Sequence, residues 1–352
     1  MSYVATLYEA SSVRIAIKAE FLAAGETSLI VAYVTRPCPL FIPLAYAYNK
    51  FKLVRKSSHL EVYKVAGPGI ILQEKFPIYG RVIALSAFRP QKSETDHLLI
   101  VVGQINYQYF TISWDPVAKK PKNERAAVDF SDNHAPLSDS FLCLSDPKNN
   151  MLGLHVYKGI FLTIPRIQPS IKGGRRSQAN PNVGNIGEHC FVRLKELEIL
   201  DLKFLFGTVL PVLAVLHKPF SGDEMAVNTY ELSIKSGEVK LSDWTIQDSK
   251  GGQEALFLIP VQLPFSGLLL IGVTKIQYFG TVGDKTFQPV DPPIVWTTWE
   301  MLSPERYILG DEEGGLHLLL LSVDTRTRKV RLRLNHIGNV SYLETSQVHH
   351  SG

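Results

Sequence analysis

Histidines are the first side chains to examine for chemistry, because imidazole can act as an acid, a base or a metal ligand near neutral pH. The chain has 10 of them among 352 residues, and they are scattered. His349 and His350 are adjacent, in a C-terminal stretch that we expect to be disordered. The sequence contains no His-Glu-x-x-His pair, no Gly-x-Ser-x-Gly elbow and no phosphate-binding loop. It therefore predicts no catalytic residues, no metal site and no cofactor.

Two charged clusters could bind ions. Asp311-Glu312-Glu313 could hold a cation, but calcium loops place oxygen ligands at alternating positions over about 12 residues. We interpret these acids as a hairpin tip in solvent that could still meet a basic partner. Lys172-Gly173-Gly174-Arg175-Arg176 could hold phosphate, since glycine exposes backbone N–H groups and arginine binds oxyanions. We interpret this cluster as a solvated loop, with an anion or nucleic-acid contact as the alternative.

A second basic feature has the period of a strand. Lys329, Arg331 and Arg333 would share one face of a strand over Lys329–Asn335, and apolar residues would share the other. We interpret the basic face as the water side of an outer strand. A patch that touches phosphate is the alternative, although aromatic stacking residues are not interleaved with it.

The four tryptophans, Trp114, Trp244, Trp296 and Trp299, are candidates for the core. Trp296 and Trp299 flank Thr297-Thr298, and we expect burial for this pair too. An exposed member would instead be a good anchor for a partner, because aromatic residues dominate interface hot spots.

These residues must be positioned by short strands. Between Leu60 and Asp115, apolar runs alternate with Gly, Pro and charged turns, without a helical period. Strands are predicted there at Leu60–Val65, Ile70–Glu74, Arg81–Phe88, His97–Val102 and Tyr107–Trp114. Later stretches repeat the pattern, including Gly267–Val273 and Gly315–Val323. The fold class is therefore all-β, and this many short strands favours a propeller of about 4–8 four-stranded blades.

Turns and loops connect the predicted strands. Tyr157-Lys158-Gly159, Lys235-Ser236-Gly237 and Asp311–Gly315 read as hairpin turns, because glycine supplies the positive φ that such turns need. Pro116–Arg125 reads as a charged loop, and Pro169–Gly187 as a flexible loop. The dipeptide Trp-Asp does not recur at the period of about 40–45 residues expected of WD repeats.

Composition sets outer limits on function. Hydrophobic residues make up 45% of the chain, enough for a large core, and the net charge of +4 permits nucleic-acid contact without implying it. Cys38, Cys143 and Cys190 are too far apart for metal-ligand spacing, which favours a reducing compartment. We find no secretory signal and no apolar run long enough to span a bilayer, so we expect a soluble intracellular protein without membrane partners.

At Leu60–Asp115 the chain resembles the family of the large subunit of damaged-DNA-binding protein, the adaptor of cullin-4 ubiquitin ligases. Its wider family includes a cleavage-and-polyadenylation subunit and a splicing-factor subunit. The resemblance continues through Ser145–Pro165, Arg193–Leu205 and Arg306–Val323. Within the family, the phrase Gln108–Asp115 favours the ligase adaptor, in a form like that of filamentous fungi.

This resemblance implies a seven-bladed propeller, the first of three in a longer chain, over residues 1–338. It implies a non-enzymatic scaffold that docks the substrate-receptor proteins of the ligase, in DNA repair and ubiquitin-dependent degradation, in nucleus and cytoplasm. Cullin binding is not expected from this part alone, because the second propeller holds the cullin. The alternatives are an RNA-processing subunit that binds nucleic acid and an enzyme on a propeller scaffold.

Two segments depart from the family. Tyr33–Arg55 interrupts a strand–turn–strand phrase, and we interpret it as translated intron sequence, with a genuine insertion at a blade edge as the alternative. Residues 339–352 form a divergent tail, where the family continues with further strands. We therefore expect an incomplete, unclosed propeller whose bare strand edges promote aggregation. The family's functional residues are expected beyond this point, so partner-binding residues are left unassigned.

Overall fold

The structure is a computed structural model. It describes residues 11–35, 58–66, 69–90, 93–103, 106–132, 134–148, 151–166, 186–220, 222, 224–235, 238–247, 249–252, 254–281, 283–324 and 329–339. All of the regular secondary structure within these ranges is β-strand, which confirms the all-β prediction. No described segment forms a helix that is long and apolar enough to cross a membrane.

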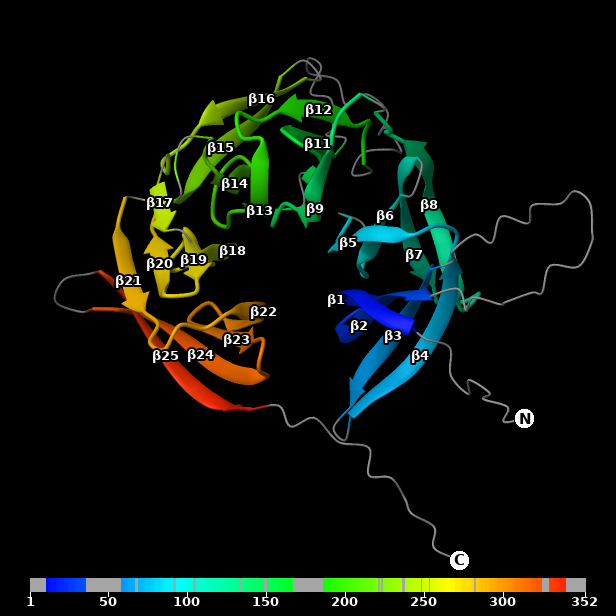
Figure 1. Cartoon of the computed structure of the whole chain (residues 1–352). Coiled ribbons are helices and arrows are strands. Elements are labelled where there is room, and N and C mark those ends of the chain that lie inside the picture. Colours follow the sequence, from blue (N-terminus) through cyan, green and yellow to red (C-terminus); the bar gives the residue numbers. More distant parts are fainter. Residues whose placement is uncertain are drawn as a thin grey trace, which may run out of the picture. The chain divides into compact units, whose positions relative to one another are not determined.

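The described strands form six antiparallel sheets, each built on four consecutive strands, and the fourth sheet has one additional strand (Figure 1). The first sheet has β1 (Ser11–Ala23), β2 (Glu26–Thr35), β3 (Ser58–Ala66) and β4 (Gly69–Ile78). The second has β5 (Val82–Phe88), β6 (His97–Gly103), β7 (Tyr107–Asp115) and β8 (Lys120–Asp129). The third has β9 (Leu137–Ser145), β10 (Met151–Tyr157), β11 (Ile160–Pro165) and β12 (Cys190–Arg193).

The remaining sheets follow the same up-and-down order. The fourth has β13 (Glu198–Phe204), β14 (Val212–Lys218), β15 (Met225–Lys235) and β16 (Glu238–Asp243), with β17 (Ser249–Gly252) paired to β15. The fifth has β18 (Ala255–Pro260), β19 (Leu268–Gly272), β20 (Lys275–Phe279) and β21 (Lys285–Pro289). The sixth has β22 (Trp296–Ser303), β23 (Arg306–Asp311), β24 (Gly315–Val323) and β25 (Val330–Asn339).

The chain divides into two compact units, and each is described separately. The first comprises residues 1–157 and 161–189, and the second comprises residues 158–160 and 190–352. Six four-stranded sheets of this kind are propeller blades, as predicted. The predicted total of seven blades and the predicted unclosed ring stay predictions.

Period-2 alternation explains why the sheets pack in layers. In β19, Leu268 and Leu270 belong to a core shared with the fourth sheet, whereas Leu269 and Ile271 belong to a core shared with the sixth. All four side chains are buried. A strand covered on both faces needs an uninterrupted apolar run, which is the feature that made this strand predictable from sequence.

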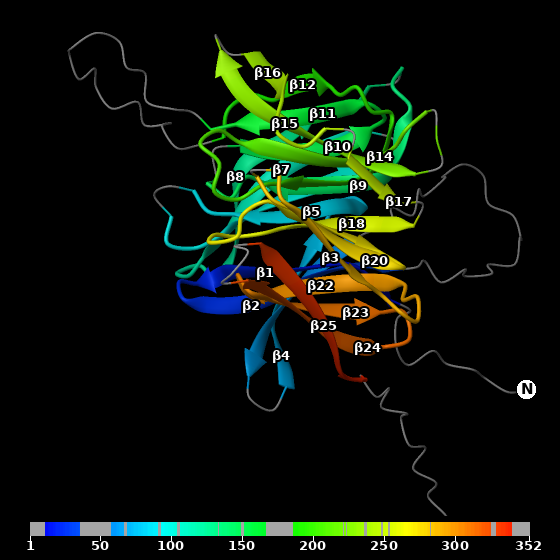
Figure 2. The same ribbon diagram turned by 90° about the vertical axis from the view of Figure 1, so that its left-hand side faces the viewer.

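The first unit repeats this arrangement. One core joins the first and second sheets and includes Phe21, Ile30, Leu60, Leu98 and Ile100, all fully buried. Trp114 packs against it and is partly buried. In Figure 2, the hairpin of β3 and β4 extends past the ends of β1 and β2.

The prediction of a charged loop at Pro116–Arg125 is wrong. Only residues 116–119 form a turn, and Lys120–Asp129 is strand β8, paired with β7. β8 is an outer strand whose residues are mostly exposed. It is held by backbone hydrogen bonds to β7 on one side. Its sequence therefore lacks the apolar run by which a buried strand is recognised. The sequence analysis also missed β1, β17, β21 and β22.

Two predicted hairpin turns are confirmed by glycines with positive φ, at Gly159 (68°) and Gly314 (86°). At the third, β15 ends at Lys235 and β16 begins at Glu238, and the two residues between lie outside the described ranges.

Several segments singled out in the sequence lie wholly or largely outside the described residues. Tyr33–Thr35 continue β2, but the rest of Tyr33–Arg55 is not described. Of Pro169–Gly187, Ile186 and Gly187 are described, and Ile186 bridges to Arg166. Outside the described ranges lie Cys38, the cluster Lys172–Arg176, residues 340–352 and the pair His349-His350. The predictions for these segments stay predictions.

Asp311 caps its own hairpin instead of lying free at the tip. Its Oδ1 accepts hydrogen bonds from the backbone N–H groups of Glu313 (3.0 Å) and Gly315 (2.6 Å). Its Oδ2 lies 3.0 Å from Nε2 of His317. The solvent-exposed interpretation therefore holds for Glu312 and Glu313 but is wrong for Asp311, whose side chain is 12% exposed.

Burial alone would raise the pKa of Asp311, but the hydrogen bonds from His317 and from the Gly315 and Glu313 N–H groups lower it overall. The folded state therefore holds the ionised carboxylate more strongly than the unfolded chain does. Its contribution to stability is present above the unfolded pKa and is lost as pH falls through the folded pKa. Asp311→Asn should cost about 1–2 kcal/mol near neutral pH, and the difference from wild type should shrink as pH falls below about 4. Urea unfolding at a series of pH values measures this.

Glu312→Gln is the matched control, because Glu312 is the next residue along and is exposed. Its stability should follow that of wild type at every pH. If the free energy of unfolding of Asp311→Asn differed from that of wild type by the same amount at every pH, including the most acidic one measured, the capping role would be contradicted.

Gly267 gives a second test of the fold. Its φ is +94°, and a Cβ built there would lie 2.2 Å from the Phe279 carbonyl oxygen. Gly283 has a similar φ of +90° with nothing within 4 Å of the same position. Both alanine substitutions carry the cost of positive φ, about 1 kcal/mol.

Gly267→Ala should lose at least about 2 kcal/mol more than Gly283→Ala, because backbone has to move to admit the methyl group. Urea denaturation midpoints of the two variants measure the difference. Equal midpoints would mean that the approach of Gly267 to Phe279 is not tight.

Candidate protein-interaction site

The first strands of three sheets border a pocket in the second unit. These strands are β13, β18 and β22, and the pocket has a volume of about 340 Å³. Its lining consists of Leu200, Asp201, Lys203, Leu256, Phe257, Thr297, Thr298 and Trp299. First strands have one long edge without a partner in their own sheet, so their side chains are available to line such a space.

A buried carboxylate fixes the wall of this pocket. Asp201 is 4% exposed, and its Oδ1 accepts hydrogen bonds from Lys203 Nζ (2.8 Å) and from the Leu202 N–H (2.9 Å). Its Oδ2 accepts the Leu258 N–H at 2.9 Å, which ties β13 to β18. A buried charge is tolerated when it is paired and hydrogen-bonded in this way. Asp201 therefore has a structural role in holding two sheets in register.

The two neighbouring tryptophans have different environments. Trp296 is buried, as predicted, and its Nε1–H donates to the Gly272 carbonyl at 3.1 Å. Trp299 is only half-buried and lies in the pocket wall beside Thr297 and Thr298. The burial expected for both tryptophans therefore holds fully for Trp296, whereas Trp299 packs against the core with part of its ring left accessible, so it is the member of the pair that could anchor a partner.

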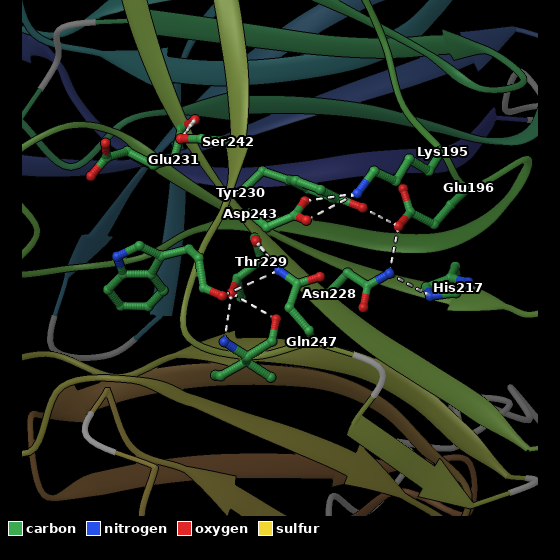
Figure 3. A network of polar contacts seen from close by, with 12 residues as sticks. Lys195, Glu196, His217, Asn228, Thr229, Tyr230, Glu231, Ser242, Asp243 and Gln247 are labelled. Atoms are coloured by element: carbon green, nitrogen blue, oxygen red, sulfur yellow. Dashed lines mark hydrogen bonds and ion pairs between the residues drawn. The ribbon is translucent and has the colours of Figure 1, made fainter.

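A second cluster of polar side chains lies around β15 (Figure 3). Glu196 is 5% exposed, and its Oε1 accepts a hydrogen bond from Asn228 Nδ2 (2.6 Å) and another from the Tyr230 hydroxyl. Asn228 Nδ2 also lies 3.2 Å from Nε2 of His217. Burial and the Glu196 carboxylate raise the pKa of Tyr230, so its phenol stays protonated.

This cluster contains the residue types of an acid–base catalytic centre, namely a carboxylate, an imidazole and a phenol. Glu196, Asn228 and Tyr230 are buried and directed toward one another, and together they fasten the turn after β12 to β15. Lys195 covers the edge, with Nζ 2.8 Å from Asp243 and 5.7 Å from the Tyr230 ring centroid. A general acid or base has to reach the substrate. We therefore assign the cluster a structural role.

The neighbouring part of the network fastens the chain after β16. Thr229 Oγ1 donates to the Ile246 carbonyl (2.8 Å) and accepts the Ile246 N–H (3.0 Å). Gln247 Nε2 donates to the Thr229 carbonyl at 2.6 Å (Figure 3). Thr229, Ile246 and Gln247 therefore satisfy one another's polar groups at this sheet edge.

The alternation predicted for Lys329–Asn335 is confirmed over residues 329–333. Val330 and Leu332 are buried, whereas Arg331 and Arg333 are exposed. Arg331 forms an ion pair with Asp324, which lowers its availability to phosphate. Within the described part of the chain, no group of three or more His, Cys, Asp or Glu side chains is arranged to hold a metal ion.

Sequence reasoning missed the buried carboxylates Asp201 and Glu196. Asp201 carried a signal, because it interrupts the apolar run Ile199–Phe206 that was assigned to a strand. A buried acid requires partners. Lys203 and the Leu202 N–H are close in sequence, but the Leu258 N–H is 57 residues away, and no local pattern reveals it.

Asp201→Asn tests the tie between β13 and β18. The amide keeps only one acceptor oxygen, so either Lys203 and Leu202 or the Leu258 N–H loses its acceptor. We expect a loss of about 2–4 kcal/mol in the free energy of unfolding, measured in urea. Asp243→Asn is the matched control, because that carboxylate is 57% exposed, and it should change stability by less than about 0.5 kcal/mol. Equal losses for the two variants would exclude a special role for Asp201.

The comparisons with known proteins agree with this architecture. Residues 12–349 match the model of the family described as the RSE1/DDB1/CPSF1 first beta-propeller. The chain is 31% identical to DNA damage-binding protein 1 of Oryza sativa subsp. japonica over 308 residues, covering 84% of this chain and 26% of the relative. It is 30% identical to DNA damage-binding protein 1a of Arabidopsis thaliana over 346 residues, covering 98% and 28% respectively.

The chain thus spans about a quarter of the length of the curated relatives that it matches. The family match covers every described sheet. On this ground, the chain belongs to the family of RSE1/DDB1/CPSF1 first β-propellers.

Proposed function

We propose that this chain is a non-enzymatic scaffold that docks partner proteins, in the manner of the first propeller of the cullin-4 ubiquitin ligase adaptor. The observation that carries the proposal is the family match over residues 12–349, together with relatives named for DNA damage binding. The partners are substrate-receptor proteins of the ligase, and the setting is DNA repair and ubiquitin-dependent degradation in nucleus and cytoplasm. A propeller of the seven-bladed type is part of the same proposal.

The geometry supports docking more than it supports a reaction. The buried polar cluster around Glu196 is turned inward, whereas the pocket beside Trp299 presents an aromatic side chain, two threonine side chains and the ion pair of Lys203 with Asp201. Side chains held on a rigid sheet can bind a partner without the entropy cost of ordering a flexible loop. We therefore place receptor docking at this pocket.

Cullin binding is not part of the proposal for this chain. The relatives extend over about four times the aligned length, and the family resemblance assigns the cullin to another propeller. The receptor-docking role can be tested separately from assembly of a complete ligase.

Trp299→Ala should weaken binding of a purified substrate receptor to the full chain by at least about tenfold, because tryptophan side chains are frequent hot spots. Biolayer interferometry with the chain immobilised measures the affinity. Phe287→Ala is the matched control, since Phe287 is 67% exposed on the outer strand β21. It should leave receptor binding unchanged, and circular dichroism at the assay temperature should show that both variants are folded.

The rival classes predict different results. An RNA-processing subunit would bind a labelled RNA with an affinity that depends strongly on salt, and it would not bind the receptor. An enzyme would show reproducible turnover. Failure of the wild-type chain to bind any purified receptor would contradict the scaffold proposal.

A further inference from the structure

A groove in the first unit has chemistry that the proposed function does not use. Its volume is about 460 Å³, and it lies between the outer strand β4 and the strands β7 and β8. Its lining consists of Phe76, Pro77, Ile78, Tyr79, Val102, Gln108, Phe110, Ile112, Pro121, Asn123, Arg125 and Ala127. Nine of these side chains are apolar or aromatic, and the remaining three are Gln108, Asn123 and Arg125.

The wall formed by β4 is apolar at its base and exposed at its end. Phe76 and Ile78 are buried and belong to the core of the first two sheets. Tyr79 follows directly, and 85% of its surface is exposed. Large apolar side chains exposed at the end of a groove are typical of surfaces that bind partners.

The opposite wall carries one charge. Arg125 Nη1 donates to the carbonyls of Ile186 (3.0 Å) and Gly187 (2.7 Å), and its guanidinium lies 5.7 Å from the centroid of the Tyr109 ring. These partners are neutral, and they fix the guanidinium in place. Among the described residues, Arg125 forms no ion pair with a carboxylate within 4.0 Å, and no acid lines the groove.

The nearest acids on the neighbouring strands do not compensate this charge. Asp129 pairs in register with Gln108, and its Oδ1 accepts the Ser131 N–H at 2.8 Å. Glu188 follows the carbonyls that Arg125 contacts, and it is exposed. The groove is therefore apolar and aromatic with a fixed positive charge at one wall.

We propose that this groove binds a short peptide segment of a partner protein that carries an apolar side chain next to an acidic side chain. The apolar side chain occupies the space between Phe76, Ile78 and Phe110, and the carboxylate faces Arg125. Gln108 and Asn123 supply amide donors and acceptors that suit a peptide backbone. Charge complementarity selects the acidic residue, and the apolar walls provide the affinity.

This surface is separate from the pocket beside Trp299, so its test does not depend on receptor docking. Random peptides of about 12 residues displayed on phage are selected against the immobilised full chain. The expected consensus contains Leu, Ile, Phe or Trp beside Asp or Glu. A fluorescein-labelled synthetic peptide with that consensus is then titrated with the chain, and its anisotropy is measured.

Asn123→Glu places a carboxylate in the groove beside Arg125, and it should weaken binding of the peptide by at least about tenfold through like-charge repulsion. Ala126→Glu is the matched control, because Ala126 is exposed on the same strand but does not line the groove. It should change affinity by less than about twofold, as should the neutral variant Asn123→Gln. Thermal melting should show that all three variants keep the fold of wild type.

Selection without a consensus, or a consensus without acidic residues, would overturn the proposal. So would a peptide whose affinity falls equally in Asn123→Glu and Ala126→Glu. Fluorescein-labelled oligothymidylate is titrated in parallel, and binding of that probe tighter than the peptide would assign the groove to single-stranded nucleic acid instead. None of these outcomes bears on Trp299 and the receptors.

Discussion

The structure depends on burial of the central strands on both faces. β19 shows the constraint most directly, because Leu268 and Leu270 face one core while Leu269 and Ile271 face another. Each such side chain contributes about 1.5–3 kcal/mol only when both neighbouring sheets are present. A single four-stranded sheet of this composition could not be stable in water, so the sheets of each unit stabilise one another.

Polar groups at the seams between sheets follow from the same constraint. Asp201 lies where β13 meets β18, and its carboxylate binds the Leu258 N–H across that seam. Glu196 similarly receives Asn228 and Tyr230 from β15. Apolar packing alone is non-directional, whereas these hydrogen bonds require one register. The buried carboxylates therefore add specificity to a core whose stability comes from leucine, isoleucine and valine.

The sequence predicted what depends on local pattern and failed where distant residues meet. β6 and β19 were predictable because strands covered on both faces read as continuous apolar runs. β8 was missed, because an outer strand needs only a backbone partner and has no pattern of its own. Trp296 and Trp299 have the same residue type and neighbouring positions, and only the structure separates the buried one from the accessible one. The Leu258 N–H that Asp201 binds across the seam is 57 residues away, and the carbonyls that Arg125 binds are 61 and 62 residues away, so no spacing rule could find these contacts.

The same architecture explains why its surfaces favour binding over chemistry. Catalysis needs polar groups that are both preorganised and open to a substrate. Here the preorganised acids and phenol are buried at the seams, where Glu196 and Tyr230 are directed toward each other. The side chains that line the pocket and groove are mainly aliphatic, aromatic, amide and hydroxyl groups, with the Lys203 ammonium paired to Asp201 and the Arg125 guanidinium held by two carbonyls. That combination can recognise shape and charge in a partner while leaving its covalent bonds unchanged.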